Sequence, residues 1–111
     1  MRMKTEFLAD CLHLLDIKRP LDLAVREVIN DWDASYVELE RRHVIEVSPR
    51  AIRCRLSLIA HELVHAAIVE KYPDAPNHGR AFQRTANRLQ SQLRRIGWEL
   101  RDKIFIQGVD K

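Results

Sequence analysis

Three histidines, and a glutamate directly after the first of them, lie close together in the segment HELVHAAIVEKYPDAPNHGRAF, residues 61 to 82. His61 and His65 are four residues apart, so on a helix both imidazoles lie on one face, one turn from each other. At this spacing both can reach a single metal ion at about 2.0–2.1 Å. Glu62 lies about 100° around the helix from His61, where it can hold a metal-activated water. Two ligands and a general base are the chemistry of the H-E-x-x-H pattern.

A third ligand is expected in the loop after this helix. Residues 72 to 79, YPDAPNHG, interrupt the helical pattern with two prolines and a glycine. The loop is long enough to fold back over the helix and bring His78 to the ion, and Gly79 lets the backbone pass close to the site. Glu70 competes for the same role, but its position is rotated away from the ligand face of the helix; Asp74 is a more distant candidate. The predicted ligands of one Zn²⁺ ion are therefore His61, His65 and His78.

The number of ligands separates a catalytic zinc from a structural one. Zinc with three protein ligands keeps a fourth position open, whereas four protein ligands close it. His13 and His43 are each isolated in the sequence, and we interpret them as surface or strand-end histidines. Three ligands beside Glu62 indicate catalysis, in which zinc activates a water and Glu62 passes the water's proton to the leaving amine. Tyr72 and Arg80 lie near the loop and could stabilise an oxyanion, but a surface role is favoured for each, so neither joins the catalytic set.

Hydrophobic periodicity predicts the elements that position these residues. In chain order they are a helix over residues 4–17, a strand over 21–28, strands SYVELE (35–40) and HVIEV (43–47), helices over 50–71 and 79–96, and a weaker strand KIFI (103–106). The fold class is therefore α+β: an N-terminal helix, a small three-stranded sheet, an active-site helix and a backing helix.

Three details of these elements are also predicted. In the paired strands, Val37 and Leu39 are expected on one face, towards the same core as Ile45 and Val47. Arg41-Arg42 is poor chemistry for a tight primed turn, so a looser connection or hairpin is expected between the strands. The last helix is expected to turn one apolar face inward, formed by Phe82, Ala86, Leu89, Leu93 and Ile96.

Length and composition limit the class of protein. The 111 residues are enough for one domain, and the net charge of +3 permits contact with nucleic acid without indicating it. Cys11 and Cys54 lie in apolar helical stretches and are interpreted as core thiols in a reducing compartment. The sequence has no Cys-x-x-Cys pair, no signal-peptide pattern and no apolar run of membrane length. We expect a cytoplasmic protein without a membrane partner.

The segment from His61 to Phe82 resembles the active-site signature of the SprT-like metalloproteases, the group that includes the Spartan proteases. These proteins combine H-E-x-x-H on a helix with a third histidine in an H-G-x-x-[F/W] segment that opens the next helix. The resemblance implies a zincin-like minimal metalloprotease fold with Glu62 as the base and with Gly79 and Phe82 supporting the third ligand. It implies a zinc-dependent endopeptidase, and we interpret residues 1–111 as one SprT-like domain without the C-terminal zinc ribbon typical of bacterial members. Its zinc ligands would be His61, His65 and His78.

The same resemblance suggests partners. The substrate would be a protein or peptide, bound as an added strand along an edge within residues 34 to 48, in SYVELE or HVIEV. DNA-associated proteins are the family's best-known substrates, and Arg80, Arg84 and Arg88 recur every four residues, as a line of guanidinium groups that tracks phosphates would. A solvated helix face explains the same arginines.

Two alternatives remain. Repressor-cleaving metalloproteases of the ImmA/IrrE type share H-E-x-x-H but typically take an acidic third ligand from a later helix, which the His78-Gly79 pair argues against. A non-catalytic, zinc-stabilised module that binds DNA or a partner protein would use the same ligands without needing Glu62 as a base.

Overall fold

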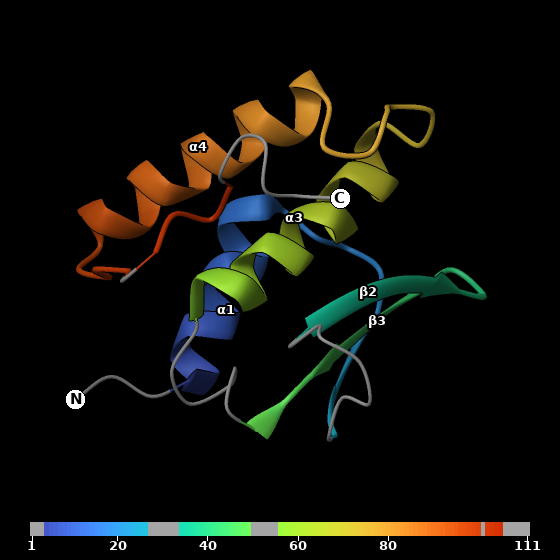
Figure 1. Ribbon diagram of the computed structural model, residues 1–111, viewed down its shortest axis with the longest axis horizontal. Coiled ribbons are helices and arrows are strands. Elements are labelled where there is room, and N and C mark those ends of the chain that lie inside the picture. Colours follow the sequence, from blue (N-terminus) through green and yellow to red (C-terminus); the bar gives the residue numbers. More distant parts are fainter. Residues whose placement is uncertain (1–3, 27–33, 50–55, 101, 106–111) are drawn as a thin grey trace.

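The computed structural model describes residues 4–26, 34–49, 56–100 and 102–105. Within them the chain forms three helices and a three-stranded sheet: α1 (Lys4–Leu15), β1 (Leu21–Val25), β2 (Ala34–Leu39), β3 (Arg42–Val47), α3 (Leu56–Lys71) and α4 (Arg80–Arg95). Figure 1 shows these helices on one side of the sheet, with α3 between the sheet and α4. The α+β class is confirmed, and so is the predicted order of the three described helices and the three strands of the sheet. None of the described helices has the length and apolar character needed to span a bilayer.

The central position of α3 explains its composition. It packs against β2 and β3 on one side and against α1 and α4 on the other. A helix covered on several sides must be apolar over most of its circumference, and Leu63, Val64 and Ala66 are fully buried. The segment of the predicted helix before Leu56, including Cys54, lies outside the described residues.

The outer helices each bury one stripe against α3. In α1 the stripe is Phe7, Cys11 and Leu15, spaced four residues apart and at most 2% exposed, which confirms Cys11 as a core thiol. In α4, four of the five predicted apolar residues are buried: Phe82, Ala86, Leu89 and Leu93. The fifth, Ile96, is 44% exposed because it caps the end of the helix instead of lying within it.

The sheet has the order β1-β3-β2, with β1 parallel and β2 antiparallel to the central strand β3. Of the two segments proposed as a substrate-binding edge, HVIEV is therefore excluded, because β3 is paired on both sides. SYVELE lies in β2, which is an edge strand next to α3.

The register of this pairing decides which face of β2 is buried. Tyr36 pairs with Ile45, so the two side chains lie on the same face of the sheet, and Ile45 is fully buried against the helices. Val37 and Leu39 therefore point to the opposite face, where they are 56% and 59% exposed. The prediction that Val37 and Leu39 face the core is wrong, and the predicted burial of Ile45 is confirmed, as it is for Val47.

The connection between β2 and β3 is tighter than predicted. Leu39 pairs directly with Arg42, so only Glu40 and Arg41 form the turn, and both have positive φ angles of 51° and 64°. Two central residues with positive φ define a type I′ turn, whose twist matches that of the flanking strands. The predicted loose connection is wrong, because the strand register outweighs the local preference for asparagine and glycine.

The segment after α4 is not a strand in the residues described. Residues 102–105 have no strand hydrogen bonding, and Ile104 is 3% exposed within the hydrophobic core. The predicted strand KIFI is therefore wrong over these positions. Figure 1 shows this stretch turning back from the end of α4 towards α3.

Candidate metal centre

The three predicted ligands meet at one point. His78 Nε2 lies 3.1 Å from His61 Nε2 and 3.0 Å from His65 Nε2. One ligand atom from each of the three residues lies within 4.8 Å of the others. Two nitrogens bound at tetrahedral angles to zinc are about 3.3 Å apart, which follows from Zn–N distances near 2.05 Å. The three imidazoles therefore lie close enough to hold a metal ion, and they offer it the same ring nitrogen.

The first two ligands come from the α-helical spacing of α3. His61 and His65 are one turn apart on the same face, with ring centroids 5.1 Å from each other. Glu62 follows His61 directly and is only 7% exposed, although it is ionisable. Few glutamates are this buried without a role, because removing a carboxylate from water is costly.

The third ligand depends on the backbone of the loop between α3 and α4. His78 has a φ angle of 55°, in the left-handed region that histidine adopts more readily than most residues. Gly79 N donates to Pro76 O at 3.1 Å, and a Cβ atom at position 79 would lie 3.1 Å from that oxygen. A side chain at position 79 would therefore require the neighbouring backbone of the loop to shift slightly. Gln83 Nε2 also donates to His78 O at 3.3 Å.

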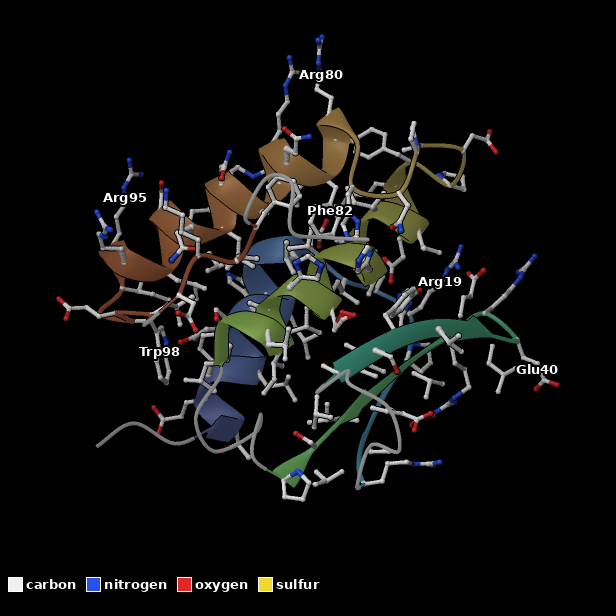
Figure 2. The ribbon with its side chains drawn as sticks, viewed as in Figure 1. Arg19, Glu40, Arg80, Phe82, Arg95 and Trp98 are labelled. Atoms are coloured by element: carbon white, nitrogen blue, oxygen red, sulfur yellow. The ribbon has the colours of Figure 1, made fainter. Side chains whose placement is uncertain are left out.

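A single aromatic ring underlies the whole centre. Phe82, 1% exposed, contacts His61, His65 and His78 with ring centroids 4.8, 4.5 and 4.8 Å away. Figure 2 shows Phe82 pointing from α4 towards α3. Its position one turn into α4 places the ring beneath the histidines and shields them from water on that side.

His61 has a partner that the sequence did not suggest. Its Nδ1–H donates to the backbone carbonyl of Ile104 at 2.7 Å. A proton held on Nδ1 leaves the Nε2 lone pair free for a metal, which is how outer hydrogen bonds orient ligating histidines. Phe105 continues this contact, with its ring 6.2 Å from His78 and 5.7 Å from Phe82. Every residue has a backbone carbonyl, so no side-chain motif in the sequence could have identified Ile104 as the acceptor.

His65 is held in its metal-binding protonation state by its surroundings. Burial, followed by the neighbouring His61 and His78, lowers the pKa of His65 to about 3. It is therefore neutral at physiological pH, as a ligand must be. The ring of Tyr36, from β2, is stacked nearly parallel to it at 12° with the centroids 6.2 Å apart. This contact places the edge strand beside the metal centre.

Glu70, the main competing ligand, is engaged elsewhere. Its carboxylate accepts hydrogen bonds from the backbone N–H groups of Lys18 and Arg19 at 3.0 and 2.9 Å. His43 Nε2 lies 2.6 Å from the same carboxylate, and Tyr36 Oη lies 2.8 Å from His43 Nδ1. Burial alone would raise the pKa of Glu70, but these hydrogen bonds outweigh it and the pKa is lowered.

The prediction that His43 is a surface or strand-end histidine is wrong, because its side chain is fully buried. Its neighbours at both ring nitrogens explain how a buried imidazole is tolerated. His13 is exposed on α1, as predicted, and Asp74 is exposed in the loop without joining the ligand group.

A pocket of about 110 Å³ opens beside two of the ligands, His65 and His78. Apart from those histidines and Asn77 its walls are apolar or aromatic, with Tyr72 at its edge and 53% exposed. Arg80 is exposed and points away from the protein in Figure 2. Omitting Tyr72 and Arg80 from the catalytic set agrees with their exposure.

The predicted arginine line is exposed along α4. Arg80, Arg84 and Arg88 are all solvent-accessible, and over the described part of the chain none of them has a carboxylate within ion-pair distance. Figure 2 shows Arg80 and Arg95 extending into solvent from opposite ends of the helix.

Comparison with known proteins adds no relative: no family model matches the chain, and no curated protein matches its sequence.

Proposed function

We propose that this chain is a zinc-dependent endopeptidase of the SprT-like, zincin type, with His61, His65 and His78 as the metal ligands and Glu62 as the general base. The observation that carries the proposal is the convergence of three histidine Nε2 atoms next to a buried glutamate in H-E-x-x-H order. Three imidazoles suit zinc, and three protein ligands are the number found in catalytic zinc sites.

The chemistry divides between the ion and the chain. Zinc, when bound, would lower the pKa of a coordinated water towards neutrality and polarise the peptide carbonyl. Glu62 takes a proton from the water while the water oxygen bonds to the carbonyl carbon of the peptide. Glu62 then gives that proton to the leaving amine as the carbon–nitrogen bond breaks. Phe82 and Phe105 keep bulk water from the inner side of the ligands.

The position of the edge strand β2 favours a peptide as the substrate. Among the described strands, only β3 pairs with β2, so the other edge of β2 carries no strand partner there. Tyr36, on β2, stacks against His65, so this edge strand lies beside the metal centre. An extended peptide that added to this edge would pass beside the metal centre, aligned by backbone hydrogen bonds. We further propose a cytoplasmic location, on sequence grounds.

Replacing Glu62 with glutamine tests the proposal. Wild type should contain about one zinc per chain, and Glu62→Gln should keep that zinc while losing cleavage of a denatured protein substrate by at least about a hundredfold. Glu99→Gln, on the exposed segment after α4, is the matched control and should cleave normally. If Glu62→Gln cleaved the substrate as fast as wild type, the assignment of Glu62 as the general base would be wrong. A wild-type protein without metal after reconstitution would remove the site.

The second candidate is a non-catalytic, zinc-stabilised module that binds DNA, and the exposed arginines of α4 favour it. Of the two functions, this one requires that DNA binding weakens when these residues become glutamine, with a log–log salt slope smaller by about 0.9 for each lost phosphate contact. They differ at Glu62→Gln, which a binding module would tolerate. A triple variant that removes the same charge from the sheet, at Arg26, Arg41 and Arg42, is the control. The variant tested is Arg80→Gln with Arg84→Gln and Arg88→Gln.

A further inference from the structure

One metal ligand, His61, is oriented by a backbone carbonyl. His61 Nδ1–H donates to Ile104 O at 2.7 Å, and this is the bond that leaves His61 Nε2 free for the metal. Ile104 lies 43 residues along the chain from His61, in the segment that turns back from the end of α4 (Figure 1). The orientation of His61 therefore depends on what holds this segment in place.

A side chain of α4 holds it. Ile104 N–H donates to Gln90 Oε1 at 2.8 Å, so the peptide groups on either side of Ile104 are engaged by α4 and by α3. The Ile104 side chain is 3% exposed in the hydrophobic core, which restrains the residue but does not set the direction of its carbonyl. The hydrogen bond to Gln90 holds the peptide group before Ile104, and together with the buried side chain it limits the directions that the Ile104 carbonyl can take.

We propose that Gln90 is a positioning residue of the metal centre, which acts on the ligand His61 through the backbone of Ile104. The inference rests on the metal site of the proposed function but not on peptidase activity. The hydrogen bond of the Gln90 side chain in the described region goes to Ile104, so its effect on the metal passes through that residue. Hydrogen-bond partners outside the ligand set typically change metal affinity by about 10–100-fold.

Variants that differ in one property separate this role from general packing. Gln90→Met keeps the length of the side chain but removes the oxygen acceptor. Gln90→Glu keeps an acceptor oxygen at the same distance along the side chain, and so should rescue. Gln92→Met is the matched control: Gln92 is a partly buried residue of the same helix whose side chain has no hydrogen-bond partner in the region described. Gln90→Asn is a milder second variant, with its acceptor one methylene further from Ile104.

The measurement is the zinc affinity of each purified protein, by competition with a chromophoric chelator at pH 7.5. A second readout is hydrogen exchange of the His61 Nδ1–H resonance in ¹⁵N-histidine-labelled, zinc-loaded protein. We expect Gln90→Met and Gln90→Asn to bind zinc at least about tenfold more weakly, with faster exchange at Nδ1. Gln90→Glu and Gln92→Met should match wild type, apart from any tighter binding that the added charge gives Gln90→Glu.

Three results would overturn the inference. These are wild-type affinity in both Gln90→Met and Gln90→Asn, an equal loss of affinity in Gln92→Met, and failure of Gln90→Glu to restore affinity. Thermal unfolding with a chelator present shows whether each variant folds; if Gln90→Met does not, Gln90→Asn decides. A wild-type protein that binds no zinc would be a different failure, that of the proposed metal centre itself.

Discussion

The third ligand is the part of the site most open to refutation, because His78 comes from a loop and not from the helix. We predict that His78→Ala weakens zinc binding about a hundredfold. Zinc contributes roughly 10–16 kcal/mol in four-ligand sites, or about 3 kcal/mol for each ligand, and this is close to two powers of ten. Both helix histidines lose one neighbour in the variant, but their own spacing on α3 is unchanged.

The same change should barely affect the metal-free fold. His78 is partly exposed, and its φ of 55° strains alanine only somewhat more than histidine, which adopts this region more readily. His78→Gly relieves roughly 1 kcal/mol of that strain but loses a similar amount through the greater freedom of the unfolded chain. In both variants the free energy of unfolding with a chelator present should therefore stay within about 1 kcal/mol of wild type.

Urea unfolding with and without excess zinc measures the two quantities separately. A dissociation constant for zinc that is a hundredfold larger lowers the zinc-dependent gain in unfolding free energy by about 2.7 kcal/mol. This holds when free zinc stays well above the dissociation constants of both wild type and variant. Asp74→Ala, which removes the other candidate ligand of the loop, should keep the full gain. The assignment of His78 would be refuted if His78→Ala kept wild-type zinc affinity, and more strongly if Asp74→Ala lost it.

Two further predictions concern the fold around the site. Glu70→Gln should cost about 2 kcal/mol at pH 7, because it removes a charged acceptor from buried His43 and from two backbone N–H groups. The pKa of Glu70 is lowered from 4.5, so its contribution is present above that pH and is lost as the pH falls through the folded value. The difference between Glu70→Gln and wild type in urea unfolding should thus shrink below pH 4.5, and a constant difference would contradict the argument. Replacing Glu40-Arg41 by Asn-Gly should stabilise the protein by about 1 kcal/mol, because both positions have positive φ. An unchanged or lower midpoint in a thermal melt would argue against the two-residue turn.

Much of the site could be predicted because its determinants are local. The separation of His61 and His65 by four residues places both on one helix face whatever the rest of the chain does. The apolar stripes of α1 and α4 likewise follow from residue spacing, and so do the helices themselves. His78 could be proposed as the third ligand because the two prolines of its loop end the helix, and the loop is long enough to fold back over it.

The features that could not be predicted all depend on pairing between distant segments. Alternation along β2 identifies two faces but not which one meets the helices, and only the pairing of Tyr36 with Ile45 decides that Val37 and Leu39 are exposed. His43 looks isolated in the sequence and is buried because Tyr36 and Glu70 come to it from other elements.

The sequence by itself determined the elements, their order and the identity of the candidate ligands, because helix geometry and residue type are properties of short stretches. Only the tertiary structure decided what surrounds those ligands. The carbonyl that orients His61 belongs to Ile104, and every residue carries such a carbonyl. Its role therefore depends on where packing places it and cannot be read from its side chain.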